Sequence, residues 1–195
     1  KLAQRLYLPE KGRVLVDDRP LDGAALAELR QRTAWVDPGV QLWNRSLLDN
    51  LRYAAGSGQD LPIASAIDQA ELRRALERMP EGLQTPLGEG GALVSGGEGQ
   101  RVRFGRALLQ GQARLVILDE PFRGLDREQR RNLLIRAQQW WRDATLLCIT
   151  HDVGETHAFD RVLVIEGGLL LEDGDPEQLA REPESKYRAL LDAEL

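Results

Sequence analysis

The stretch LVILDE, residues 115–120, constrains the fold more strongly than any other part of the sequence. Four apolar residues in a row, without alternation, are typical of a strand that is buried on both faces of a parallel sheet. Asp119 and Glu120 follow at once. Because open α/β sheets bind their ligands at the C-terminal ends of the strands, the stretch predicts both a central strand and a candidate site.

The segments around this strand alternate between strand and helix patterns. The expected strands are 13–17, 33–36, 114–120, 145–150 (a second buried strand) and two within 161–174 around Gly167-Gly168, and the expected helices are 98–110, 127–143, a short one at 155–160 and a broken one in 176–195. This alternation predicts an α/β layered fold with a mostly parallel sheet.

Residues 38–95 interrupt the alternation and are expected to form a mainly helical insertion. Within it, the apolar residues Ile67, Leu72, Leu76 and Met79 fall at helical spacing and fit one stripe of a helix over 63–79.

Composition limits the classes of function. The 195 residues are 42% hydrophobic and 29% charged, as in globular proteins, and the net charge is −5. Scattered Lys and Arg, without a basic stripe, argue against nucleic-acid binding. One cysteine, Cys148, allows no disulfide within the chain and fits a reducing compartment. No apolar run approaches the roughly 20 residues that span a bilayer, so if the protein serves a membrane, its membrane-spanning part is expected elsewhere.

The two adjacent acids after the central strand can divide the chemistry of a phosphate reaction. Asp119 is expected to hold Mg²⁺, because Mg²⁺ favours one or two carboxylates together with phosphate oxygens. Glu120 can orient or deprotonate an attacking water. The alternative is a solvated strand end without a role. His151, which follows the next strand, is expected at the same edge of the sheet, where it can bond a phosphate or position the water.

A second candidate site is LVSGGEGQR, residues 93–101. Ser95 and Glu98 form the S-x-x-E pattern of a capping box at a helix start. The capping box alone explains these two residues without a ligand, but it does not explain Gly96 and Gly97, which weaken a helix by about 1 kcal/mol each relative to Ala. A phosphate lying against the bare backbone at the helix N-terminus explains them. No lysine follows to complete a phosphate loop.

Four motifs together resemble the nucleotide-binding domain of an ATP-binding cassette (ABC) transporter. Residues 94–101 resemble the signature L-S-G-G-Q-x-Q-R, LVILDE the Walker B strand, 124–126 (GLD) the D-loop and 150–152 (THD) the switch histidine. The resemblance implies a P-loop NTPase-like (RecA-like) core at 1–37 and 96–175, a helical subdomain at 38–95 with Q-loop, X-loop and signature, and a C-terminal helical tail at 176–195.

The same resemblance implies ATP and Mg²⁺ as cofactors and a second nucleotide-binding domain as partner. In the family, two such domains pair head to tail, so Ser95, Gly96, Gly97 and Glu98 would face the ATP held by the partner, and Asp126 would couple the two sites. Asp119 would serve Mg²⁺, Glu120 the water, and His151 the γ-phosphate.

Two further runs resemble exporter-type members. TPLGEGGALVSGG (85–97) would place Glu89 in the X-loop, and QLWNRSLLDNLRY (41–53) would place Trp43 near a membrane domain, the alternative being an ordinary packing residue. This resemblance implies a membrane domain on the same polypeptide. It also implies a place at the cytoplasmic face of the membrane, which is the inner membrane in a Gram-negative cell.

The sequence departs from the family pattern at two motifs. The Walker A loop would lie upstream of Lys1, which is not its lysine, so the chain as given is expected to be inactive alone. In the Q-loop, Pro38 stands where the family has glutamine. Asp37 could substitute as an oxygen ligand, Gln41 could after a shift in register, or no substitute exists. The Q-loop change raises a second hypothesis, a non-hydrolysing half of an asymmetric pair.

Overall fold

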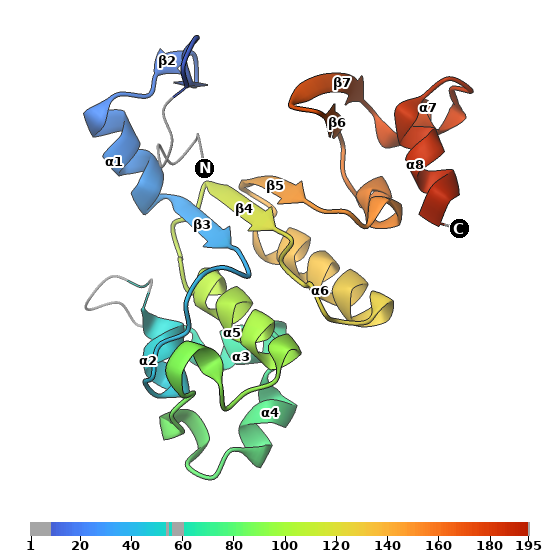
Figure 1. Ribbon diagram of the computed structural model, residues 1–195. Helices are drawn as coiled ribbons and strands as arrows, with labels where there is room; N and C mark the ends of the chain where they lie inside the picture. Colours follow the sequence, from blue (N-terminus) through green and yellow to red (C-terminus); the bar gives the residue numbers. More distant parts are fainter. Residues whose placement is uncertain (1–8, 54, 56–60, 195) are drawn as a thin grey trace. The chain divides into compact units, whose positions relative to one another are not determined.

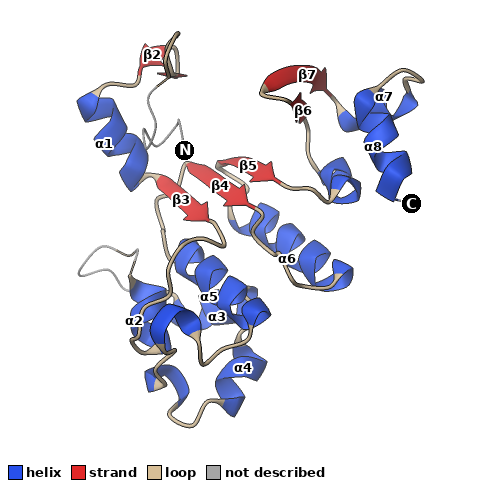
Figure 2. Ribbon diagram, viewed as in Figure 1, coloured by secondary structure: helices blue, strands red, loops and turns tan. Residues whose placement is uncertain are grey.

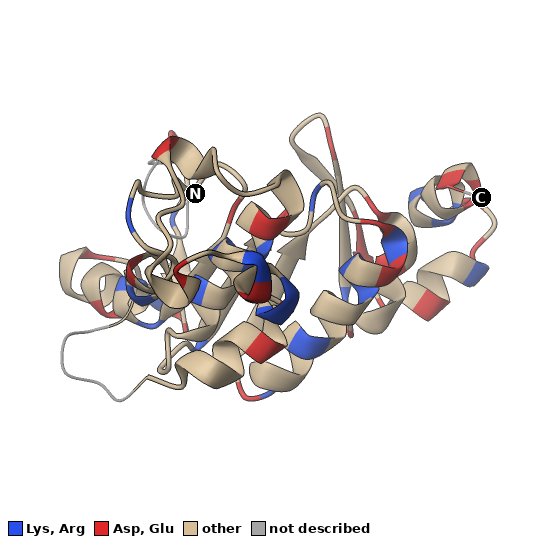
Figure 3. Ribbon diagram, turned by 90° about the horizontal axis from the view of Figure 1, so that it is seen from below, with Lys and Arg blue, Asp and Glu red and all other residues tan. Residues whose placement is uncertain are grey.

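The computed structural model describes residues 9–53, 55 and 61–194, which fall into two compact units, Lys1–Ile149 and Thr150–Leu195 (Figure 1). Lys1 lies outside the described residues. Acidic and basic residues are interspersed along the described helices (Figure 3).

The centre of the first unit is a three-stranded parallel sheet in the order β3 (Thr33–Val36), β4 (Leu115–Asp119) and β5 (Thr145–Ile149). Ala34 pairs with Val116, and Leu118 pairs with Cys148. The apolar centre of β4 is buried, which confirms the prediction from its continuous apolar run. Helices α5 (Gly96–Leu108) and α6 (Arg127–Trp140) lie on one side of this sheet in the view of Figure 2.

Strand β5 differs from the prediction of a buried strand. Its residues alternate between exposed and half-buried, with Leu147 43% and Ile149 46% exposed. Among the residues that the structure describes, the strand lies at the edge of the sheet and only one of its faces is covered. An apolar run alone therefore did not decide whether both faces are buried, because that depends on what packs against the sheet.

The helical insertion contains α2 (Leu47–Arg52), α3 (Ile63–Gln69), α4 (Arg73–Arg78) and the 3₁₀ turns η1 (Gly82–Gln84) and η2 (Glu89–Gly91). The expected single helix over 63–79 is wrong. Glu71 has a positive φ of 53°, and the N–H groups of Glu71 and Leu72 return to the carbonyls of Asp68 and Ile67. This is the Schellman arrangement that ends a helix. Ile67 and Leu72 are still buried. The pattern thus predicted correctly that these two side chains face the core, but it predicted one continuous helix where the structure has two.

Helix α5 packs against the insertion through a glycine. A Cβ atom built at Gly105 would lie 2.9 Å from Leu51 and 3.4 Å from Leu72, so the absence of a side chain lets α2 and the residue that precedes α4 approach α5 closely.

The N-terminal part of the first unit contains a short hairpin of β1 (Leu15–Val16) and β2 (Arg19–Pro20), followed by α1 (Gly23–Gln31). The strand expected at 13–17 is thus only two residues long. The sequence pattern did not indicate α1, which buries none of its residues and begins at the cap Asp22. A helix without a buried stripe gives no periodic signal.

The second unit contains η3 (Val153–Ala158), the hairpin β6 (Val162–Glu166) and β7 (Leu169–Gly174), and the helices α7 (Pro176–Arg181) and α8 (Lys186–Glu194). The turn at Gly167-Gly168 is confirmed, with φ values of 58° and 81° that favour glycine. Val164, Leu179 and Tyr187 form the core of this unit. Among the helices of the described residues, none has the length and apolar character needed to cross a membrane.

Candidate functional site

The two acids lie at the C-terminal end of β4, as predicted. Asp119 is the last residue of the strand and pairs with Ile149, and Glu120 follows with its N–H donating to the Ile149 carbonyl at 2.9 Å. The φ of Glu120 is +43°, in the left-handed region that is unfavourable for a residue with a Cβ atom. Such strain persists where the surrounding structure imposes it, and it clusters at functional sites. The conformation favours a site over an ordinary solvated strand end.

A turn after the acids leads into α6. Arg123 Nη1 lies 3.8 Å from Glu120 Oε2, a long separation for an ion pair, and the arginine side chain is 76% exposed. Gly124 has a φ of 85°, which a side chain would disfavour. Asp126 caps α6, since its Oδ1 accepts from the N–H of Gln129 at 2.8 Å. The expected D-loop therefore starts a helix in addition to any role across a dimer.

The capping box at the start of α5 is present. Glu98 Oε2 accepts from the Ser95 N–H at 2.9 Å, and Ser95 Oγ accepts from the Glu98 N–H at 3.3 Å. Arg78 Nη2 donates to the other carboxylate oxygen at 2.5 Å. The bond from the Ser95 backbone is the main reason that the pKa of Glu98 is lowered, and Arg78 lowers it further.

The two glycines of this segment have different surroundings. A Cβ atom at Gly96 would meet no atom within 4 Å, whereas one at Gly97 would lie 2.6 Å from Leu125 Cδ2. Packing within the chain thus accounts for Gly97, and the phosphate argument from the sequence retains its full weight only for Gly96. Ser95 and Gly96 are exposed, so they are accessible to a ligand. The Leu125 contact also brings the signature segment and the D-loop together.

The loop at the predicted Q-loop position is folded on itself. Asp37 Oδ1 accepts from the Gly39 N–H at 2.6 Å, so this oxygen already has a partner. Arg103 of α5 donates from Nε to the Val40 carbonyl at 2.6 Å. Burial lowers the pKa of Arg103, and the negative charge of Asp37 partly offsets the lowering. Pro38 offers no side-chain oxygen.

A buried network that the sequence analysis did not identify fixes the next part of this loop to α5. Arg106 Nε and Nη2 donate to the backbone oxygen and the Oδ1 of Asn50, and Nη1 donates to the Gln41 carbonyl. Burial lowers the pKa of Arg106 to about 10, with the charge of Arg103 contributing, so the guanidinium stays protonated at neutral pH. The available signal was one polar residue near apolar residues on the same turn of each helix: Asn50 lies close to Leu47 and Leu51, and Arg106 lies close to Val102 and Leu109.

The same network supports an exposed aromatic pair. The Asn50 side chain accepts from the Trp43 N–H at 2.9 Å and donates to the Trp43 carbonyl at 3.0 Å. The rings of Trp43 and Tyr53 lie 5.4 Å apart and are 36% and 60% exposed. Glu89, the expected X-loop residue, is exposed in η2.

His151 lies two residues after β5 and belongs to the second unit. The Asp152 N–H donates to Thr150 Oγ1 at 3.0 Å, which closes a tight turn around the histidine. This bond joins the residues on either side of His151.

The donors at the end of β4 fit a hard divalent cation. Asp119 and Glu120 supply carboxylate oxygens, and across the described ranges no group of three or more His, Cys, Asp or Glu residues is arranged to hold a metal. Carboxylates are ligands that Mg²⁺ prefers, one or two of them together with substrate phosphates.

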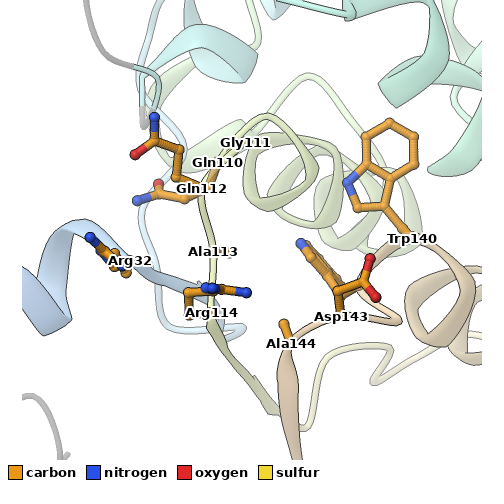
Figure 4. Close-up of a pocket in the computed structure, with 10 residues that line it drawn as sticks. Arg32, Gln110, Gly111, Gln112, Ala113, Arg114, Trp140, Asp143 and Ala144 are labelled. Carbon is orange, nitrogen blue, oxygen red and sulfur yellow. The ribbon is translucent and has the colours of Figure 1, made fainter.

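A cavity of about 440 Å³ lies elsewhere in the first unit (Figure 4). Arg32, Arg114, Asp143 and Trp140 are among the residues that line it. Arg114 directly precedes β4 and Ala144 precedes β5, so the cavity lies at the opposite ends of these strands from Asp119. It is not part of the acidic site.

Comparison with known proteins agrees with the geometry. A family profile described as ABC transporter matches residues 1–123. The chain is 34% identical over 189 residues to the ATP-dependent lipid A-core flippase of Chromohalobacter salexigens, covering 97% of this chain and 32% of that protein. It is 34% identical to the alpha-hemolysin translocation ATP-binding protein HlyB of Proteus vulgaris over 193 residues, which are 97% of this chain and 27% of HlyB. The chain thus spans about a third or less of the length of these relatives.

A solved structure gives the same result. The chain matches a bacterial Atm1-family ABC exporter with ATP bound, with a TM-score of 0.91 and 26% identity over 99% of this chain and 34% of that one. The predicted α/β fold of the P-loop NTPase type is therefore confirmed. With the acids at the end of β4 and the capped glycine segment of α5 in place, the chain belongs to the ABC transporter family.

Proposed function

We propose that this chain is the ATP-hydrolysing nucleotide-binding domain of an exporter, and that two such domains close on ATP and reopen after hydrolysis. The strained backbone of Glu120 at the end of β4 is the observation that carries the proposal. The names of the relatives, a flippase and a translocation protein, support the direction of transport.

Each residue has a distinct role in the proposed reaction. Glu120 accepts the proton of the attacking water, and Asp119 holds the cation through its carboxylate. Mg²⁺, when bound, neutralises charge on the phosphate oxygens. His151 donates to the γ-phosphate. Asp37 remains the candidate for a second oxygen ligand through the carboxylate oxygen that Gly39 does not occupy.

The exposed start of α5 serves the other half of the dimer. Gly96 and Gly97 present their backbone N–H groups, and Ser95 its hydroxyl, at the positive end of the helix to the ATP of the partner domain, while Glu98 holds the cap. Asp126 links the two sites across the dimer. We place the domain at the cytoplasmic face of the membrane, joined to a membrane domain on the same polypeptide that Trp43 contacts.

Replacing Glu120 with Gln in the full-length protein tests the catalytic assignment. The amide keeps the shape but loses the basic oxygen, so ATP turnover should fall by about 100-fold or more and the ATP-bound dimer should persist. Phosphate release and size-exclusion chromatography with ATP measure both effects. Glu77→Gln, at an exposed position of α4, is the matched control. Turnover of Glu120→Gln at the wild-type rate would rule out the assignment.

The second candidate is a non-hydrolysing half of an asymmetric pair, and it is motivated by Pro38 and by the engagement of Asp37 with Gly39. The ATPase rate of the full-length homodimer separates the two candidates. An active homodimer excludes the second one, and a homodimer that binds ATP without turnover supports it.

A further inference from the structure

The end of helix α8 contacts the segment that follows His151, and both belong to the second unit. The carboxylate of Glu194 accepts two consecutive backbone N–H groups: Oε1 accepts from Val153, and Oε2 accepts from Gly154 at 2.7 Å. These two N–H groups belong to the first residues of η3, where backbone N–H groups have no partner inside the helix. Asp152, at the cap position of η3, makes no side-chain capping bond to it. Glu194 supplies the cap from 40 residues away.

Helix α8 itself does not explain the position of this acid. Glu194 is the last residue of α8, which has no basic residue in its last turn. A negative charge at the C-terminal end of a helix is unfavourable, because the macrodipole is negative there. The charge becomes favourable only through the N–H groups of η3, which point at it.

Further contacts hold the same segment to α8. Thr156 Oγ1 lies 2.7 Å from the hydroxyl of Tyr187 and also donates to the Val153 carbonyl at 2.6 Å. Tyr187 is fully buried, and its ring packs edge-on against His157 with centroids 5.9 Å apart. The hydrogen bond between Thr150 and Asp152 fixes the backbone around His151. The bond from Gly154 to Glu194 fixes the backbone shortly after it.

We propose that Glu194 is a positioning residue of the ATPase site, which fixes His151 through the backbone of residues 153–154. The inference rests on the proposed role of His151 in ATP hydrolysis. It gives the C-terminal end of α8 a role in positioning a residue of the ATPase site.

The test compares ATP turnover of the full-length wild-type protein with Glu194→Gln. The amide loses the charge and one of the two acceptor oxygens, so His151 is held less firmly and kcat should fall by about three- to tenfold. Asp192→Asn is the matched control, because it removes the same charge from an exposed side chain in the last turn of α8, where Asp192 faces Arg188 at 3.9 Å. This control should keep the wild-type rate.

A double-mutant cycle separates positioning from general stability. If Glu194 acts through the histidine, Glu194→Gln should lower kcat in the wild-type background but have no further effect when His151 is replaced by Ala. An equal fall in both backgrounds would mean that Glu194 only stabilises the fold, and it would overturn the proposal.

Amide hydrogen exchange tests the contact without relying on turnover. Val153 and Gly154 should exchange faster in Glu194→Gln than in wild type, and unchanged exchange would overturn the proposal. A wild-type protein without ATPase activity would overturn the proposed function together with this inference. An active wild type that needs His151 but tolerates Glu194→Gln would overturn this inference alone.

Discussion

Alanine substitutions at the two adjacent glycines of α5 should have opposite effects on stability. Both changes remove a helical glycine and gain up to about 1 kcal/mol of helix propensity. At Gly97 the new Cβ would lie 2.6 Å from Leu125 Cδ2, closer than real contacts allow, whereas at Gly96 nothing lies within 4 Å. Overpacking of this kind costs about 1–3 kcal/mol. Since the propensity gain is shared, the difference between the two variants should equal the overpacking cost.

Thermal unfolding measures this difference. For a chain of this size, 1 kcal/mol shifts Tm by about 2–4 °C, so Gly97→Ala should melt about 2–12 °C below Gly96→Ala. Replacing Leu125 with Ala should remove the difference, because the clashing methyl group is then absent. Equal melting temperatures of the two single variants would refute the packing explanation of Gly97.

The ATPase rates of the same variants test the role of the bare backbone. Gly96→Ala should keep or raise stability and yet lose most of the turnover, because its methyl group would stand between the helix N-terminus and the phosphate of the partner domain. A stable Gly96→Ala variant that hydrolyses ATP at the wild-type rate would refute the proposed approach of phosphate to this position.

Two further predictions concern stability. Arg106→Met removes three hydrogen bonds: the backbone carbonyls of Asn50 and Gln41 lose this donor, and Asn50 Oδ1 keeps the bond from the Trp43 N–H. We therefore expect a loss of about 3 kcal/mol in the free energy of unfolding, measured by thermal melts, with Arg74→Met on the exposed side of α4 as control. A loss below about 1 kcal/mol contradicts the role of the network. The pKa of Glu98 is lower in the folded state than in the unfolded state. The ionised side chain therefore stabilises the fold above its unfolded pKa of about 4.3, and this stabilisation is lost as pH falls through the folded pKa. Tm of wild type should therefore fall more steeply below about pH 4 than Tm of Glu98→Gln, and parallel pH profiles would contradict this.

Local patterns in the sequence determined much of the fold and the candidate site. The continuous apolar run before Asp119 specified a central strand, Ser95 and Glu98 specified a capped helix start, and Gly167-Gly168 specified a hairpin turn. Each of these signals lies within a few residues, because hydrogen-bond closure and side-chain periodicity act over one or two turns of chain.

Only the tertiary structure decided what packs against these elements. Leu125 approaches Gly97 across 28 residues of sequence, as their numbering shows, and Glu194 reaches Gly154 across 40. The exposure of Leu147 and Ile149 on β5 depends likewise on what packs against that face of the sheet. Such contacts leave no periodic trace, since they join segments whose separation along the chain is set by the fold and not by the geometry of a helix or strand.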